Sequence, residues 1–475
     1  MRRVLFIFLL VCGTWPATAQ VTLPEMGSSS RATLSEAEER KLGEAFMREV
    51  RAHLEIEDDA EVEDYVQSLG YALSAHSDTP NQRFTFFVVK DTRINAFAAP
   101  GGYIGVNSGL ILAAESESEL AAVMAHEIAH VSQGHIARAI DMAGRSNLPA
   151  MAGMVAAIIL GTQNPQMGQA AMAAVTAGRI QLQLDFTRSN EQEADRLGIR
   201  VLSDAGFDPR AMPTFFERLQ QSYRYYREPP EFLSTHPVSS SRISDTRGRA
   251  ESYPYRQYVD SIGYQLARAK LQVWAEKKPE DAVAIFRQQL GQSSGQSRQI
   301  ARYGLALALA RAGDSAGARS HLEALTKASP ERLQFVTALA SLELESGALE
   351  QALTRYRTSL RLFPDNKPLL RGYIAALLKD HKPERALGLL ERYARRRPLT
   401  APLYKLKAET HDQLGQVLQA HLALAEHHYL NGRLEAAIQQ LRIATRERTD
   451  DFFLNSRVEA RLDYYREERA QRAAK

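Results

Sequence analysis

The first apolar pattern in the chain has helical spacing and follows an extended lead-in that contains Pro, Gly and Ser. Four apolar residues recur at intervals of four: Leu42, Phe46, Val50 and Leu54. Residues at this interval share one face of a helix, and a Thr or Ser ahead of the acidic residues at 36–39 supplies an N-cap. A second pattern of this kind predicts a helix from Glu61 to Ala75.

Two segments after this helix pair indicate short strands. The run from Arg83 to Lys90 is rich in β-branched and aromatic residues, which favours a strand. The segment from Asn95 to Asn107 predicts two further strands, bent at the Pro-Gly-Gly sequence 100–102. Residues 95–106 either form an exposed edge, where an extended peptide could add by main-chain hydrogen bonds, or lie inside a small sheet.

The next predicted element is a helix that is rich in Ala, Leu, Met and Glu. It covers Glu119 to Val131, with no Gly or Pro before Gly134. A later helix is expected from Ser189 to Ala205. The mostly apolar segments within 148–175 are too short to span a bilayer. They predict a hairpin that covers a neighbouring site, an interfacial membrane contact or a plain core helix.

From about residue 256 the sequence consists of helix pairs with a fixed period of 34 residues. Three residue types keep this interval: Pro330, Pro364 and Pro398; Ala284, Ala318, Ala352, Ala386 and Ala420; and Gly313, Gly347 and Gly415, with His381 at the skipped position. Gly in the turn, Ala where helices cross and Pro closing each unit are typical of tetratricopeptide repeats. Gly432 and Ala437 repeat the Gly/Ala pair after half a period, so one helix is expected to serve two repeats.

The N-terminus predicts export. A basic pair at positions 2–3 precedes an apolar run at 4–11, and the small residues 17–19 resemble a cleavage site. Eight apolar residues cannot span a bilayer, which argues against a membrane anchor. Cys12, the only cysteine, offers a lipoprotein alternative, although the residue before it is bulkier than a lipobox prefers. We expect a signal peptide cleaved after Ala19.

Length and composition indicate more than one globular domain. The chain has 475 residues, of which 44% are hydrophobic and 24% charged. We expect a mainly α protein: a signal peptide at 1–19, an α+β domain at 20–255 with a small sheet around the central helix, and an all-α tetratricopeptide solenoid at 256–475. The net charge of +3 is too small for a nucleic-acid-binding surface, so no nucleic-acid partner is expected.

Candidate chemistry lies in the central helix. His126 and His130 are four residues apart, so their imidazoles can point at a common centre, and Glu127 lies beside it. This HExxH arrangement is that of helical zinc proteases. A catalytic zinc takes three protein ligands and keeps a place for water. Glu191 can be the third ligand, and Asp195, one turn later, can accept a hydrogen bond from a ligating imidazole; the alternative is two exposed acids on a charged helix.

Four motifs together resemble a known family: Asn95-Ala-Phe-Ala-Ala-Pro-Gly-Gly, His126-Glu-Ile-Ala-His130, Asn190-Glu-Gln-Glu-Ala-Asp195 and Ser234-Thr-His-Pro237. They are similar to the zinc metallopeptidases that include HtpX and the CAAX prenyl proteases, from Leu23 to about Arg247. The resemblance implies a helical core around Zn²⁺, one per chain. It also implies that His126, His130 and Glu191 are the ligands and that Glu127 is the catalytic base.

Together with the signal peptide and the repeats, the resemblance implies a location in the periplasm of a Gram-negative bacterium and a role in outer-membrane protein quality control. The implied partners are unfolded or misassembled outer-membrane β-barrel proteins and their assembly machinery. The membrane-embedded relatives have spanning segments that this sequence lacks, which argues against lipidated substrates inside a bilayer. A peripheral membrane contact is the one membrane role retained.

Three further residues have open roles. His236 could bind the zinc and latch the enzyme, donate to the oxyanion of a tetrahedral intermediate, or be a satisfied structural histidine. Arg242 could pair with an acid of the site or with none. His135 lies about 140° round the helix from His130, which indicates a structural role.

These observations predict an exported zinc endopeptidase that cleaves misfolded or stalled outer-membrane proteins, with catalytic roles for Glu127, His236 and Asp195. Its repeat domain would recruit substrate or assembly machinery. The alternative is a periplasmic chaperone or assembly factor with a largely latched protease site. A third hypothesis, an adaptor with a dead protease domain, is disfavoured because a scaffold has no need of a water-activating Glu127.

Overall fold

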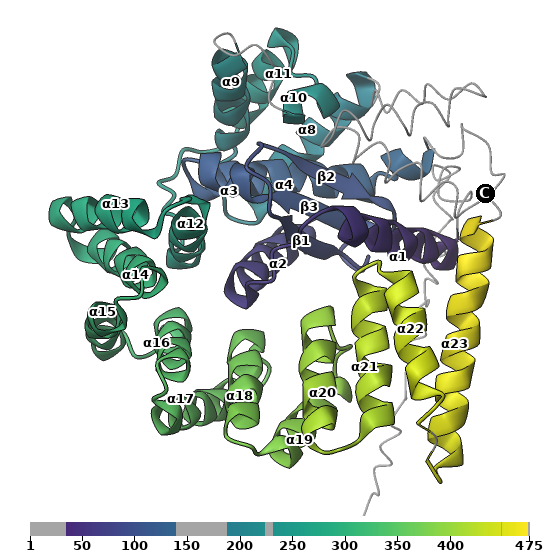
Figure 1. The fold of residues 1–475 in the computed structure, drawn as a ribbon. Coiled ribbons are helices and arrows are strands. Elements are labelled where there is room, and N and C mark those ends of the chain that lie inside the picture. Colours follow the sequence, from purple (N-terminus) through teal and green to yellow (C-terminus); the bar gives the residue numbers. More distant parts are fainter. Residues whose placement is uncertain (1–34, 139–187, 224–230, 448, 474–475) are drawn as a thin grey trace, which may run out of the picture.

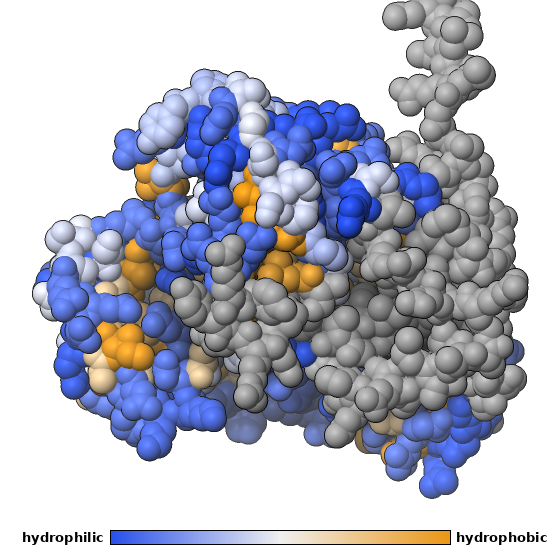
Figure 2. Space-filling view, turned by 90° about the horizontal axis from the view of Figure 1, so that it is seen from above, coloured by the Kyte–Doolittle hydropathy of each residue, from blue (hydrophilic) through white to orange (hydrophobic). Residues whose placement is uncertain are grey.

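The computed structural model describes residues 35–138, 188–223, 231–447 and 449–473 (Figure 1). No helix within these ranges combines the length and the apolar character needed to cross a membrane. The predicted signal peptide, Cys12 and the apolar segments within 148–175 lie outside the described residues. Seen from the side of α9 and α11, the described surface is mainly hydrophilic, with apolar residues in small groups (Figure 2).

Two helices open the first domain, as their apolar spacing predicts. α1 (Glu36–His53) begins at Ser35, which forms a capping box with Glu38: the Ser hydroxyl accepts from the Glu38 amide, and the Glu38 carboxylate accepts from the Ser35 amide. α2 (Ala60–Ser74) begins at Asp59, whose side chain accepts from two backbone amides.

A three-stranded sheet of order β1-β3-β2 follows. β1 (Thr85–Val89) runs parallel to β3 (Tyr103–Asn107), and β2 (Ala96–Ala99) runs antiparallel to it. The single turn η1 (Pro100–Gly102) makes the predicted bend, with positive φ at both glycines. Among the described strands β2 is therefore an edge strand and β3 an internal one, as expected for β3, whereas the side chains of β2 are mostly buried and its exposure as an edge stays a prediction.

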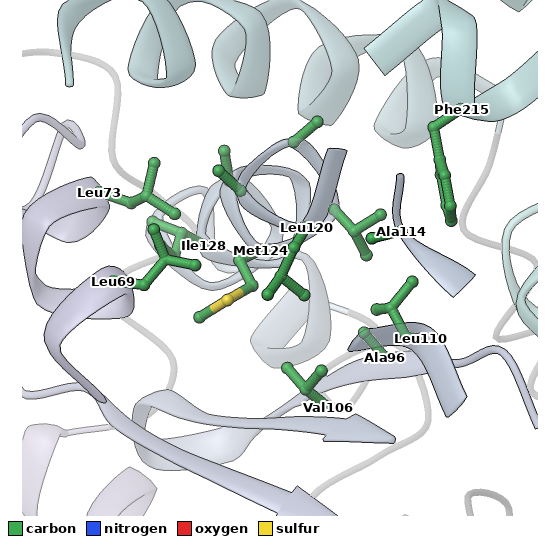
Figure 3. Close-up of a cluster of buried hydrophobic side chains, with 14 of the residues drawn as sticks. Leu69, Leu73, Ala96, Val106, Leu110, Ala114, Leu120, Met124, Ile128 and Phe215 are labelled. Atoms are coloured by element: carbon green, nitrogen blue, oxygen red, sulfur yellow. The ribbon is translucent and has the colours of Figure 1, made fainter. Parts of the chain in front are cut away.

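The helix that carries the HExxH motif is the centre of this domain. α3 (Ser108–Ala113) leads into α4 (Glu117–Ser132), and every residue of α4 is buried. Figure 3 shows Leu120, Met124 and Ile128 of α4 among side chains of α2, the sheet and α9. A helix that is buried on all sides belongs in the interior of a domain. Within the part of this domain that the structure describes, four helices follow: α8 (Arg188–Asp204), α9 (Ala211–Tyr223), α10 (Glu231–Thr235) and α11 (Ser240–Glu251).

The rest of the described chain is an array of antiparallel helices (Figure 1). Their bounds are α12 (Ile262–Ala275), α13 (Pro279–Gln292), α14 (Gly295–Arg311), α15 (Ser315–Ala328), α16 (Leu333–Glu345), α17 (Leu349–Leu362), α18 (Lys367–Lys379), α19 (Pro383–Ala394), α20 (Ala401–Gln413), α21 (Val417–Leu430), α22 (Leu434–Ala444) and α23 (Phe452–Ala473). α21 packs against both α20 and α22. That one helix serves two repeats stays a prediction, because α14 likewise packs against both of its neighbours.

The 34-residue register is visible in the turns between paired helices. Gly313, Gly347, Gly415 and Gly432 have φ of 86°, 83°, 69° and 71°, a region that glycine enters without steric cost. His381 stands at the skipped position and has φ 52°, the one positive φ of a non-glycine residue in the described part of the chain. The backbone of this turn therefore keeps the repeat geometry although the side chain has changed.

One position of the predicted alanine register is wrong. Ala318, Ala352 and Ala386 are completely buried where helices cross, but Ala284 is exposed and Ala282 is buried in its place. Each buried alanine is the fourth residue of its helix. Because α13 and α15 begin 36 residues apart, rather than 34, the first repeat is out of register by two residues.

The array curves around the first domain, so that α1 and α2 face its inner side (Figure 1). Lys367 pairs with Glu63 of α2, and Arg371 donates to the carbonyl of Asp58. Lys270 of α12 is partly buried between the carboxylates of Asp59 and Glu61, at 2.7 Å from each. A cavity of about 750 Å³ remains between the 54–58 segment and the array.

The N-terminus of α4 is tied to the first helix of the array. The Glu117 carboxylate accepts from the Ser261 amide at 2.6 Å, from the Ser261 hydroxyl at 2.7 Å and from the Tyr65 hydroxyl at 3.0 Å. In return, the Glu117 amide donates to Asp260 at 2.7 Å. Ser261 is also the N-cap of α12, so the catalytic-motif helix and the repeat array share one hydrogen-bonded junction.

Candidate metal centre

Two helices that pack closely bring the predicted site residues together. α4 carries His126, Glu127 and His130, and α8 carries Glu191 and Asp195. A Cβ added at Gly198 of α8 would lie 3.2 Å from the backbone nitrogen of His126. The absence of a side chain at this position therefore allows α8 to approach the two histidines.

Four side chains converge on one point. His126, His130, Glu191 and His236 each place one potential ligand atom within 4.8 Å of the others, and all four are buried. The Nε2 atoms of His126 and His130 are 3.0 Å apart, and Glu191 oxygens lie 3.5 Å and 3.4 Å from them. The predicted ligand triad is thus assembled in space, with His236 as a fourth member.

The spacing fits a tetrahedral zinc. Bonds of about 2.0–2.1 Å at tetrahedral angles place neighbouring ligand atoms about 3.3 Å apart. The distances from Nδ1 of His236 to Nε2 of His126 and to Oε1 of Glu191 are 3.3 Å and 3.1 Å, so they also match. Two facing imidazole nitrogens cannot both donate to each other, whereas both can bind a shared cation. The donor set of nitrogens and a carboxylate is one that zinc prefers.

Glu127 lies next to His236, at the ring nitrogen that does not face His126 and Glu191. Its carboxylate is 3.3 Å from Nε2 of His236 and is hydrogen-bonded to the backbone amide of Ala98 in β2. Burial raises the pKa of Glu127, although the neighbouring His236 and His126 oppose this shift. The edge of β2 that is opposite β3 therefore faces the site at the residue expected to act as base.

Asp195 contacts both the imidazole of His126 and the guanidinium of Arg242. Its Oδ1 is 3.0 Å from Nδ1 of His126, the position from which an acceptor fixes the tautomer that leaves Nε2 free for a metal. Arg242 of α11 forms a bidentate pair with Asp195 at 2.7 Å and 2.8 Å and reaches Glu191 at 2.8 Å. The expectation that Arg242 pairs with acids of the site is confirmed.

The predicted position of His135 relative to His130 is wrong, although nothing contradicts its predicted structural role. α4 ends at Ser132, and a turn at residues 133–134, with φ 65° at Gly134, redirects the chain before helical residues begin again at His135. Nδ1 of His135 then lies 2.7 Å from Nδ1 of His130, and its Nε2 lies 3.3 Å from Glu193. The expected angle of about 140° does not apply because the helix has already ended; Gly134 is the signal of this in the sequence.

The ionisable side chains of the cluster shift one another's pKa values. Burial would lower the pKa of His126, but hydrogen bonds to Asp195 and Glu191 outweigh it and raise the pKa to about 9. Burial holds the pKa of His130 well below its ordinary value. The pKa of Glu191 is lowered against the effect of burial by the three histidines around it. The carboxylate is thus kept ionised, as a metal ligand must be.

Family comparisons agree with the two-part organisation. Residues 60–250 match the model of peptidase family M48. Tetratricopeptide repeat models match residues 266–332, 303–367 and 343–410. The boundary predicted at 255 lies between the two groups of matches but is not itself tested by them.

Several curated proteins are similar over most or part of the chain. The β-barrel assembly-enhancing protease of Escherichia coli K12 is 34% identical over 447 residues, which cover 94% of this chain and 91% of that protein. The protein of the same name from Yersinia pestis is 33% identical over 449 residues, covering 94% and 92%. The human mitochondrial metalloendopeptidase OMA1 is 28% identical over 236 residues, covering 48% and 44%. Among solved structures, a tetratricopeptide repeat protein from Parabacteroides merdae matches 58% of this chain and 94% of its own, with 15% identity and a TM-score of 0.30.

Proposed function

This chain belongs to peptidase family M48, and from that premise we propose that it is an exported zinc metalloendopeptidase that cleaves misfolded or stalled outer-membrane β-barrel proteins. The observation that carries the proposal is the buried cluster of His126, His130 and Glu191 beside the carboxylate of Glu127. The outer-membrane substrate class is supported by the name of the relatives, whose similarity extends over more than nine-tenths of this chain.

One Zn²⁺ per chain would be held by His126, His130 and Glu191. When bound, zinc polarises the scissile carbonyl and lowers the pKa of water to about 7. Glu127 is placed to accept the proton of the attacking water and to return it to the leaving amine. Burial raises the pKa of Glu127, which is the direction that makes its carboxylate a stronger base for this exchange.

Asp195 and Arg242 are positioning residues in this scheme. Asp195 orients the imidazole of His126, and Arg242 fixes Asp195 through two parallel hydrogen bonds. Arg242 also neutralises part of the charge on Glu191. Removal of either residue would therefore loosen a ligand without removing one.

The edge of β2 is the proposed place for substrate. The backbone of Ala98 points at Glu127, on the side of β2 opposite β3. An extended peptide that pairs with this edge would present a main-chain carbonyl next to the base, largely independent of its sequence. The amide of Phe232 in α10 donates to the carbonyl of Ile94 at 3.2 Å. A peptide could therefore not pair with the chain at Ile94, just before β2.

The position of His236 suggests a second, inactive form of the metal site. Its Nδ1 lies where a fourth ligand atom would be, and that place is needed by water or substrate. In this arrangement the site would be latched, which supports the alternative of a chaperone or assembly factor with occasional proteolysis. Release of His236 would open the site and leave its imidazole free to donate to the developing oxyanion.

The mature protein is proposed to reside in the periplasm of a Gram-negative bacterium after cleavage at Ala19. The repeat array would recruit substrate or assembly machinery through the surfaces that α1 and α2 leave uncovered. N-terminal sequencing of the protein from a periplasmic extract tests the export step directly.

The decisive experiment compares Glu127→Gln and His236→Ala with the natural chain on an unfolded outer-membrane β-barrel substrate. We expect Glu127→Gln to retain one zinc and to lose activity at least about a hundredfold. His236→Ala should retain zinc; cleavage at least as fast as that of the natural chain would mean that His236 is only a latch, and slower cleavage would mean that it also donates to the oxyanion. Unchanged cleavage by Glu127→Gln would refute the peptidase proposal. If cells that carry Glu127→Gln keep normal outer-membrane protein assembly, the chaperone alternative is favoured.

A further inference from the structure

The repeat array contains a pocket that belongs neither to the metal centre nor to the junction between the domains. It lies where α17, α18 and α19 meet and has a volume of about 320 Å³. α17 and α19 are on the outer rim of the array, away from α1 and α2 (Figure 1). The pocket is therefore separate from the cavity that faces the first domain.

Apolar and charged side chains occupy different layers of this pocket. Its floor consists of buried side chains that are 3–8% exposed: Leu360, Leu370, Tyr373 and Tyr393. Its rim carries four exposed arginines: Arg357 and Arg361 from α17, Arg392 from the last turn of α19 and Arg396 from the segment that follows it. Among the residues that the structure describes, no carboxylate lines the pocket.

Most of this positive charge is not neutralised within the described residues. Arg396 pairs with Asp365 at 3.1 Å, whereas no ion pair is formed there by Arg357, Arg361 or Arg392. Other arginines of the array do find carboxylates. Arg355, two residues before Arg357, pairs with Glu343 at 2.7 Å.

The helix dipole accounts for only part of the arrangement. Arg361 and Arg392 lie in the last turns of their helices, where a cation is favourable. Arg357 lies further from the helix end, and Arg357 and Arg361 stand four residues apart, a spacing at which like charges repel. The convergence of four guanidinium groups on one apolar floor needs a further reason.

We propose that this pocket binds an acidic peptide segment of a partner protein, with one large apolar side chain inserted between flanking carboxylates. A volume of about 320 Å³ accepts one Phe- or Leu-sized side chain with part of its backbone. Carboxylates on either side of this anchor would meet the rim arginines, which bind such groups in bidentate pairs. The site goes beyond the proposed peptidase activity and does not depend on it.

The order of the two layers selects a peptide over an anionic lipid. A head-group site places cations at the bottom, where the phosphate enters, and leaves the acyl chains outside. Here the apolar residues form the bottom and the cations form the rim. A phosphate at the rim would leave the apolar floor unfilled, whereas an apolar side chain with acidic neighbours satisfies both layers.

The test uses the full chain carrying Glu127→Gln, so that the probe is not cleaved, and the fluorescein-labelled peptide Asp-Glu-Phe-Asp-Glu. Fluorescence anisotropy should show saturable binding, weakened about tenfold or more when the central Phe is replaced by Ala. The double variant Arg361→Glu/Arg392→Glu should weaken binding by at least about tenfold. Arg442→Glu, at an exposed arginine of α22, is the matched control and should stay within about twofold.

Thermal unfolding of each variant checks that any loss of binding is not caused by a loss of folding. Equal binding of the Phe and Ala peptides would overturn the proposal, because the floor would then have no role. Unchanged binding by the double variant would overturn it as well. The proposal would also be overturned if the peptide does not bind but phosphatidylglycerol vesicles do, and if that vesicle binding depends on Arg361 and Arg392.

Discussion

The side chain of His135 folds back over the metal-ligand helix so that its Nδ1 lies 2.7 Å from Nδ1 of His130. If His130 uses Nε2 for the metal, its Nδ1 carries the hydrogen and His135 must accept it. His135 then carries its own hydrogen on Nε2, 3.3 Å from the carboxylate of Glu193. Burial lowers the pKa of His135 to about 4, which keeps the ring neutral and able to accept.

His135→Phe should therefore weaken metal binding while leaving the ligands intact. We expect zinc affinity, measured by competition with a chromogenic chelator, to fall about 10–100-fold. His135→Gln, which can still accept a hydrogen bond, should recover part of the loss. His76→Phe, at an exposed histidine, is the control. A zinc affinity of His135→Phe equal to that of the natural chain would show that His135 only fills space.

Asp195 predicts a specific pH dependence of stability in the metal-free protein. Burial would raise its pKa, but His126 and Arg242 outweigh burial and lower it below the ordinary value. The folded state then binds fewer protons than the unfolded state, so the contribution is complete above the unfolded pKa of about 3.9. It is lost as the pH falls through the folded pKa.

Asp195→Asn should therefore destabilise the metal-free protein most near neutral pH. The gap in free energy of unfolding between the natural chain and the variant should narrow as the pH is lowered from about 6 towards 3. Urea unfolding followed by circular dichroism measures it. Asp204→Asn, at the exposed end of the same helix, separates this effect from the mere loss of an acid. A gap that widens in acid would contradict the assigned pair.

His381 predicts a stabilising substitution. It occupies the turn position that is glycine in the neighbouring repeats and has φ 52°. A side chain in this left-handed region costs about 1–2 kcal/mol relative to the right-handed one. His381→Gly should thus raise the free energy of unfolding by about 1 kcal/mol, after the greater entropy of glycine in the unfolded chain is subtracted. His381→Ala should not share the gain.

The sequence predicts elements whose cause is local, and the turn at His381 illustrates this. Periodicity places α1, α2 and the helix pairs, and the i, i+4 spacing brings His126 and His130 to one point. The need of a zinc site for a third ligand, and of a ligating histidine for a hydrogen-bond acceptor, points in the sequence to Glu191 and Asp195. A fixed period fails at Ala284 because α13 and α15 begin 36 residues apart, two more than the period of the other repeats.

Contacts between distant segments cannot be obtained in this way. Helical spacing misplaces His135 because a single glycine ends the helix before it. The bidentate grip of Arg242 on Asp195 depends on how α11 packs against α8. The seating of α1 and α2 inside the array joins residues about 300 apart, such as Glu63 and Lys367. No spacing or composition rule records such contacts.

The junction at Glu117 predicts that the repeat array and the catalytic helix are energetically coupled. The buried carboxylate of Glu117 accepts three hydrogen bonds, two of them from the N-cap of α12. Glu117→Ala leaves these donors buried without their acceptor, so it should lower the free energy of unfolding by about 2–4 kcal/mol. Glu115→Ala removes a carboxylate that is 71% exposed and should cost less than about 0.5 kcal/mol.

Hydrogen exchange then distinguishes coupling from general destabilisation. If the junction holds α12 to α4, the amides of residues 261–264 should lose protection in Glu117→Ala more than those of α16 to α18 do. The Glu117→Gln variant keeps one acceptor oxygen and should show an intermediate loss. Uniform loss across the array would mean that Glu117 contributes only to the stability of the first domain. In that case a partner bound to the repeats would have no route through this junction to His126 and Glu127.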